Sequence, residues 1–222
     1  MIFSFDYLKN AVDLKENGIV TLSIENKTVF RNIVGAFKSG ELEENGIVFS
    51  ENYQPIDCKK YVCFIDDFFN PEFPSAFLKK LYTDAAQCCH NELLDETLKF
   101  KSAYEVLMSG IICKFDYDLT CNYDFDLAAF LKFRGLCPAL TGEGLLENLL
   151  EYILLISKYS AVKCFVALNL HLFFMREELG KLFEELNMNH ISMLVIEGAL
   201  PEAYPKNQKI YILDEDLCEI SD

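Results

Sequence analysis

Residues 162–168 read Val-Lys-Cys-Phe-Val-Ala-Leu, and residues 191–196 read Ile-Ser-Met-Leu-Val-Ile. Both runs are short and mostly apolar, which predicts two buried strands. Between them, residues 177–186 place leucines and charged side chains at helical spacing. A strand, a helix and a second strand in this order predict a β-α-β crossover and therefore a parallel sheet. A further apolar run, Lys209 to Leu213, extends this sheet.

The amino-terminal part of the chain alternates strand and helix in the same way. Short β-like runs cover Ile2 to Phe5 and Ile19 to Ile24, and apolar residues then recur at spacings of three and four. Asn26 is placed to cap the predicted helix at its start, and Gly40 is placed to end it. The α/β layer is therefore built from both ends of the chain.

A third apolar run, Tyr61 to Ile65, ends in Asp66 and Asp67. A continuous apolar run is typical of a strand buried in the centre of a parallel sheet. The two carboxylates are then expected at the carboxyl-terminal edge of the sheet, where α/β proteins bind their ligands.

The middle of the chain has a helical pattern instead. From about residue 75, apolar residues keep helical spacing, and further helical stretches continue to residue 159. We therefore predict an α/β fold in which residues 1–74 and 160–222 form a head domain with a mostly parallel sheet. Residues 75–159 are predicted to form an inserted α-helical leg domain.

Composition and charge limit the class of protein. The 222 residues are 51% hydrophobic and 25% charged, which is typical of a folded chain and not of an acidic disordered tail. The formal net charge of −15 argues at first against a nucleic-acid partner. The longest uncharged run, residues 164–175, is shorter than the roughly 20 residues that span a bilayer, and the first residues lack a basic secretory signal. We therefore expect no membrane partner and a cytoplasmic location.

The nine cysteines fit a reducing compartment, because their number is odd and several fall inside apolar runs. Most are expected to be small core residues. A zinc site is the alternative, and it would use Cys58, Cys63, Cys88, Cys89 and His90. Structural zinc sites usually show compact paired spacing, and no paired C-x-x-C occurs here, so the core interpretation is favoured.

An apolar strand that ends in Asp66-Asp67 also suggests a nucleotide hydrolase, in which such a carboxylate binds magnesium. The nearest phosphate-loop candidate is Gly35 to Gly40, which continues with Glu41-Leu42 in place of Lys and Ser or Thr. The phosphate charge and one magnesium ligand would then be missing. Gly40 is better explained as a helix C-cap, so we reject ATP hydrolysis. No G-x-S-x-G nucleophile motif is present, and no catalytic residue is predicted.

An acidic segment lies between two of the predicted helices. Residues 116–126 contain Asp116, Asp118, Asp124 and Asp126 together with Asn122. Such dense carboxylates are either solvated or bridged by a cation, and oxygen ligands in a flexible loop suit calcium. The spacing is not that of an EF-hand. Asp124 is also a plausible N-cap for the next helix, and Asp126 a favourable acid in its first turn.

Basic residues are sparse and occur as small groups, of which Lys79-Lys80 and the pair Lys132 and Arg134 lie in the helical region. Each group would ordinarily be a solvated face. Oligomerisation could still assemble such groups into a phosphate-binding surface, because each copy adds to the local positive potential.

Taken in order, these features resemble a known family, the small accessory protein of type II-A CRISPR adaptation modules. The resemblance covers essentially the whole chain, and its order and total length are more specific than any single motif. It rests on the segments Lys163 to Asn169, Met193 to Glu197, Tyr211 to Asp216, Phe3 to Phe5, Ile19 to Ile24, the surroundings of Asp66, and Tyr123-Asp124 before a helix that ends at Gly135.

The resemblance implies a head with a degenerate P-loop ATPase-like sheet, a helical leg and no catalytic activity. It also implies a ring-shaped homotetramer that encircles linear double-stranded DNA, holds calcium and supports spacer acquisition beside the adaptation integrase and the effector nuclease. Calcium is then expected near Asp116, Asp118, Asp124 and Asp126. For DNA, Lys79 and Lys132 fall at family-like basic positions, and Lys80 and Arg134 are their neighbours.

One other class of function stays open on the sequence, a protein-interaction scaffold for the integrase, with an acidic exterior and no direct DNA binding. A divergent ATPase would show nucleotide turnover that Asp66→Ala abolishes, and we expect no such turnover. The number of cysteines departs from the family, which leaves a redox or metal role open.

Overall fold

The computed structural model describes residues 1–122, 124–200 and 204–221, and it divides into two compact units. One unit combines residues 1–72 and 140–222, and the other comprises residues 73–139. The first boundary falls two residues before the predicted one. The second boundary was predicted wrongly, because helix α7 (Leu145–Tyr159) belongs to the α/β unit and not to a helical leg.

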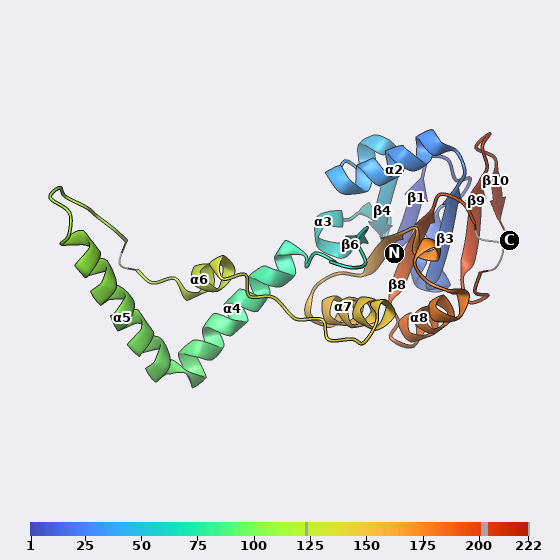
Figure 1. Ribbon diagram of the computed structural model, residues 1–222. Helices are drawn as coiled ribbons and strands as arrows, with labels where there is room; N and C mark the ends of the chain where they lie inside the picture. Colours follow the sequence, from blue (N-terminus) through green and yellow to red (C-terminus); the bar gives the residue numbers. More distant parts are fainter. Residues whose placement is uncertain (123, 201–203, 222) are drawn as a thin grey trace. The chain divides into compact units, whose positions relative to one another are not determined.

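The α/β unit is built around a six-stranded sheet in the order β10-β9-β3-β8-β7-β6 (Figure 1). All neighbouring pairs are parallel except β9 and β10. The α/β prediction and the parallel β7-α8-β8 crossover are confirmed. The strands are β3 (Ile19–Ile24), β6 (Val62–Ile65), β7 (Cys164–Leu168), β8 (Ser192–Glu197), β9 (Lys209–Leu213) and β10 (Glu219–Ser221).

Strand β6 lies at the edge of this sheet, so the prediction of a central strand for the run ending at Ile65 was wrong. Its burial alternates, with Cys63 and Ile65 buried and Val62 and Phe64 only partly covered. Tyr61 ends the short helix α3 (Cys58–Tyr61) instead of starting the strand. An apolar run of four or five residues therefore reports burial on one face here, and not a central position.

A second, antiparallel sheet was not predicted beyond its first strand. It has the order β2-β1-β4-β5 and contains β1 (Ile2–Phe5), β2 (Val12–Asp13), β4 (Ile47–Glu51) and β5 (Gln54–Pro55). Two of these strands have only two residues each, which is too short for a sequence period to show.

One hydrophobic core joins the two sheets and helix α2 (Lys27–Ser39). It contains Phe3 and Phe49 from the small sheet, Leu22 and Leu194 from the large sheet, and Ile33 from α2. Helices α7 and α8 (Arg176–Met188) lie on the other side of the large sheet from α2 (Figure 1). Shorter elements complete the unit: α1 (Leu14–Asn17), η1 (Glu43–Asn45) and η2 (Leu170–Leu172).

The helical unit contains α4 (Ser75–Glu92), α5 (Leu94–Ile112) and α6 (Leu127–Phe133), and α4 packs against α6. Three aromatic side chains connect α5 with α6. Phe125, which precedes α6, lies 5.4 Å from Phe100 of α5 and 5.8 Å from Phe130 of α6 between ring centroids. Among its described residues only Phe77 and Tyr82 are buried hydrophobics. Every helix that the structure describes is too short or too polar to cross a membrane.

Candidate functional site

The carboxyl ends of the five parallel strands meet at one edge of the large sheet, which is where α/β folds bind ligands. Each strand ends in, or is followed within a residue by, a carboxylate or an amide. The residues in strand order are Asp214, Glu25, Glu197, Asn169 and Asp66. The sequence predicted only the last of them at this edge.

The turn from β3 into α2 occupies the place of a phosphate-binding loop, and its donors are already used. The Asn26 Oδ1 accepts hydrogen bonds from the N–H groups of Thr28 (3.1 Å) and Val29 (3.2 Å). The Asn26 amide in turn donates to the Glu215 carbonyl at 2.9 Å. Because a phosphate would need these same N–H groups, the helix start is not prepared for one.

The candidate loop from Gly35 to Gly40 lies at the opposite end of α2. Gly35 is inside the helix, and Gly40 is its C-cap with φ of 80°, donating its N–H to the Ala36 carbonyl. The C-cap interpretation is therefore confirmed. A phosphate loop connects the end of a strand to the start of a helix, whereas Gly35 to Gly40 form the end of a helix and its cap.

Asp66 is paired with a cation from that same segment. The Lys38 Nζ lies 2.6 Å from the Asp66 Oδ2, beside a cavity of about 290 Å³ that Phe37, Phe64 and Tyr152 help to line. The ammonium group thus neutralises the carboxylate that a hydrolase would place on magnesium. Asp67 instead orders its own loop, because its carboxylate accepts hydrogen bonds from the N–H groups of Phe69 and Asn70.

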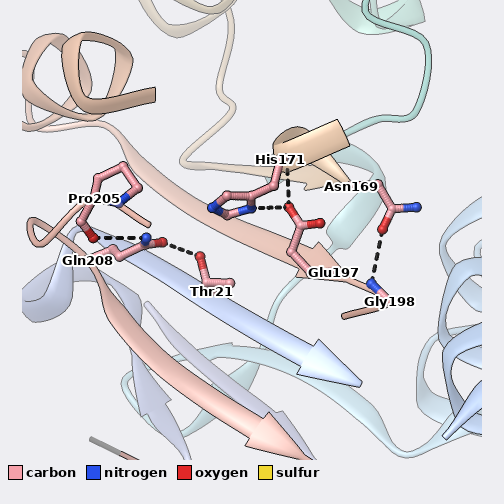
Figure 2. Close-up of polar contacts among 7 residues, drawn as sticks. All are labelled: Thr21, Asn169, His171, Glu197, Gly198, Pro205 and Gln208. Atoms are coloured by element: carbon pink, nitrogen blue, oxygen red, sulfur yellow. Dashed lines mark hydrogen bonds and ion pairs between the residues drawn. The ribbon is translucent and has the colours of Figure 1, made fainter. Parts of the chain in front are cut away.

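A buried carboxylate, that of Glu197, lies at the end of β8 and beside the end of β7 (Figure 2). Glu197 is only 2% exposed, and its Oε1 accepts from the His171 Nδ1 at 2.6 Å and from the His171 backbone N–H at 3.2 Å. Nδ1 is therefore the protonated ring nitrogen, since a carboxylate can only accept. Beside it, the Asn169 side chain accepts from the Gly198 N–H at 3.0 Å.

A second series of hydrogen bonds in Figure 2 connects β3 with the segment before β9. The buried Thr21 hydroxyl contacts the Gln208 side-chain oxygen, and the Gln208 amide donates to the Pro205 carbonyl at 3.1 Å. The polar groups of the sheet are thus satisfied largely by the chain itself. Sequence reasoning did not find the pair of His171 and Glu197; the signal available was a glutamate directly after the apolar run Met193 to Ile196.

The acidic segment forms no assembled cation site. Asp116, Asp118, Asp124 and Asp126 are all exposed, and the described part of the chain contains no group of three or more His, Cys, Asp or Glu side chains arranged to hold a metal ion. Asp126, and not Asp124, is the N-cap of α6, because its carboxylate accepts from the Ala129 N–H at 2.9 Å. Tyr123, named in the family resemblance, lies outside the described residues.

The four basic residues predicted to bind DNA all belong to the helical unit. Lys79 and Lys80 lie on α4, Lys132 lies in the last turn of α6 and Arg134 follows it. All four are exposed, and none forms an ion pair with an acid in the described part of the chain. Since α4 packs against α6, two segments far apart in the sequence bring these free cations into one unit.

The nine cysteines are free thiols, of which two are buried, four are exposed and three, Cys58, Cys89 and Cys121, are partly exposed. Cys63 and Cys164 are buried, and burial raises the pKa of both thiols, that of Cys164 to about 12. Cys88, Cys113, Cys137 and Cys218 are exposed. The zinc alternative gains no support, because no metal-binding group of His, Cys, Asp or Glu occurs among the residues described.

Alkylation of the native protein at about pH 8 is expected to separate the buried thiols from the exposed ones. The thiolate is the reactive form, so Cys63 and Cys164 should react at least about tenfold more slowly than the four exposed cysteines. Peptide mass spectrometry after timed iodoacetamide treatment measures each rate, and denatured protein serves as the control. Equal rates for Cys164 and Cys218 in the native protein would contradict the assigned burial.

The comparison with protein families agrees with these features. A family model described as CRISPR-associated protein (Cas_Csn2) matches residues 40–217, which begin directly after α2 and include the helical unit and four of the six strands of the large sheet. No curated protein matches the chain. The matched range covers well over half of the sequence, with all of the helical unit and part of the α/β unit. The chain therefore belongs to the Cas_Csn2 family, the accessory CRISPR-associated proteins of type II-A systems.

Proposed function

We propose that this protein is a non-catalytic, double-stranded DNA-end-binding ring protein that supports spacer acquisition in the cytoplasm. The observation that carries the proposal is the group of four exposed and unpaired cations, Lys79, Lys80, Lys132 and Arg134, in the helical unit of a Cas_Csn2 family member. Phosphate contacts of this kind bind the backbone without reading its sequence. The absence of sequence preference suits a protein that handles DNA ends.

The helical unit also supports self-association into a homotetramer. Helix α5 has no buried residue, and it exposes large apolar side chains along its length. Exposed apolar surface of this extent in a folded chain marks an interaction site. The exposed residues of α5 are Leu94, Leu98, Phe100, Val106, Leu107 and Ile111.

Calcium is proposed as the stabilising ion, with Asp116, Asp118, Asp124 and Asp126 as its carboxylate ligands. Four exposed carboxylates within one irregular segment fit the flexible oxygen coordination of calcium. The proposal requires these side chains to converge when the ion binds. Closed rings of this kind would act with the adaptation integrase and the effector nuclease.

The central test is removal of the four cations. Binding to a linear duplex is expected to weaken strongly in the variant, and the slope of log affinity against log salt should fall by about 0.9 for each phosphate that the variant no longer neutralises. A gel-shift series over several salt concentrations measures both quantities. The substitutions are Lys79→Ala, Lys80→Ala, Lys132→Ala and Arg134→Ala.

A matched control removes the same charge from exposed positions of the α/β unit, and it should bind DNA like the unaltered protein. Its substitutions are Lys27→Ala, Arg31→Ala, Lys59→Ala and Lys181→Ala. Closed-circular duplex, and a series with and without calcium, complete the experiment. Equal binding to linear and closed-circular DNA, or the same weakening in both variants, would contradict the ring model.

A further inference from the structure

A patch of large apolar side chains is exposed on the α/β unit, on the loops that follow the neighbouring strands β6 and β7. We call it the Phe69 patch, and it comprises Phe69 (67% exposed), Leu172 (77%), Phe173 (45%) and Met175 (71%). The buried Phe68 contacts Phe173 of the patch at 5.2 Å and the buried Phe174 at 5.8 Å between ring centroids. Phe69 and Phe173 meet edge to face at 6.1 Å. Phe69 and Phe173 therefore form one surface, and Leu172 and Met175 lie within two residues of Phe173 on the second loop.

The backbone that presents this patch is held firmly on both loops. The Asp67 carboxylate accepts from the N–H of Phe69 at 2.9 Å, and the Glu178 carboxylate accepts from the N–H of Met175 at 2.7 Å. Within the second loop, the His171 ring is held by the buried Glu197. A surface that is ordered before it binds loses less entropy on association, so apolar exposure here is suited to recognition.

The two loops that carry the patch are also rich in carboxylates. Residues 66–72 and 169–178 contain five acids and one basic residue, Arg176. Asp66 is paired with Lys38, which leaves the others to set the local charge. The five acids are Asp66, Asp67, Glu72, Glu177 and Glu178. An apolar centre with an acidic rim is complementary to a segment that is apolar in its middle and basic at its margins.

A second copy of the same chain fits this surface poorly. In a two-fold contact the patch would face itself, and the rim carboxylates of one copy would face those of the other. The chain also carries a formal charge of −15, so other faces of a second copy are acidic on average. We propose that the Phe69 patch docks a separate protein through a basic amphipathic segment, with an apolar side chain of that segment seated against Phe69 and Phe173.

This inference is independent of DNA binding, and it is tested without nucleic acid. The probe is a fluorescent helical peptide of lysine and leucine with one apolar face. A charge-reversed peptide with glutamate for lysine and a second peptide with serine for leucine serve as comparisons. Fluorescence anisotropy is expected to show binding of the first peptide alone, and this binding should weaken as salt is raised.

Two variants and a matched control assign the binding to the patch. Phe69→Ala with Leu172→Ala should lower the affinity for the basic peptide by about tenfold or more, because aromatic anchors carry much of the binding energy of such contacts. Glu177→Lys alters one exposed rim charge and should weaken binding and its salt dependence. Tyr53→Ala with Met188→Ala removes two other exposed apolar side chains and should leave binding unchanged.

Several results would overturn the inference. They are equal binding of the charge-reversed peptide, no binding of the basic peptide, or equal weakening in the Phe69 patch variant and its control. Sedimentation of the unaltered protein and of the Phe69→Ala, Leu172→Ala variant gives a further test. If the variant no longer self-associated, the patch would be a contact between copies. DNA retardation by this variant should equal that of the unaltered protein, whatever the outcome for the four cations of the helical unit.

Discussion

Replacing Glu197 with alanine is expected to lower the free energy of unfolding of the α/β unit by about 2–5 kcal/mol, because each buried donor left without a partner costs about 1–3 kcal/mol. The carboxylate is 2% exposed and accepts both the ring Nδ1–H and the backbone N–H of His171. Alanine leaves these two donors buried without a partner and opens a cavity at the end of β8. Urea unfolding followed by circular dichroism measures the effect, and hydrogen exchange of the β8 amides locates it in this unit.

Two controls separate the missing acceptor from a general effect of the substitution. Glu197→Gln keeps a side-chain oxygen that can accept from His171, although the residue is now neutral. It should therefore lower the free energy of unfolding by less than Glu197→Ala does. Glu25→Ala removes an exposed glutamate at the end of β3 and should change stability by less than about 0.5 kcal/mol. If Glu197→Ala were as mild as Glu25→Ala, the buried pair would have no structural role.

Ile153→Ala is the second large effect, with an expected decrease of about 2–5 kcal/mol in the stability of the α/β unit. Ile153 is fully buried on α7, together with Leu149, Tyr152 and Ile156. Truncation removes buried apolar atoms and leaves a cavity that the surrounding helices and strands fill only in part. The measurement is again urea unfolding, with hydrogen exchange of the β7 and β8 amides as the local readout.

The matched control for this variant is Ile220→Ala on β10, since the same atoms are removed from a side chain that is 51% exposed. Ile220→Ala should lower the free energy of unfolding by less than about 1 kcal/mol. If Ile153→Ala left β7 and β8 unaffected and destabilised only the helical unit, α7 would belong to that unit after all. The domain boundary that places α7 in the α/β unit would then be wrong.

Much of the secondary structure was predictable from local pattern. The runs at β1, β3 and β9 have the predicted limits, and α2 begins after Asn26 and ends before Gly40 as its caps indicate. These features depend on residues within one turn or one strand, so the sequence contains them directly. The short strands β2 and β5 were missed because two residues cannot display a period.

Features that depend on long-range packing were predicted less well. Helix α7 has a continuous helical pattern after a helical region, so the sequence alone assigned it to the wrong domain. Strand β6 was placed in the centre of the sheet, although it lies at the edge. In both cases the error concerns which element packs against which, and a local pattern carries no information about that choice.

The candidate sites follow the same division. The sequence identified Asp66 at a strand end and the cations of the helical region, because charged residues beside apolar runs are visible locally. It could not pair Lys38 with Asp66 or His171 with Glu197, which are 28 and 26 residues apart in the chain. Nor could it show that the donors at the start of α2 are already occupied.

By itself, the sequence of this protein determined an α/β chain with a helical insertion, the limits of β1, β3, β9 and α2, and its strong acidity. These follow from the spacing and type of neighbouring residues. Tertiary structure decided the strand order, the unit to which α7 belongs, the closure of the sheet edge by buried polar groups, and the exposure of the Phe69 patch. Those properties arise when distant segments compete for the same buried surface, and the result depends on the whole fold.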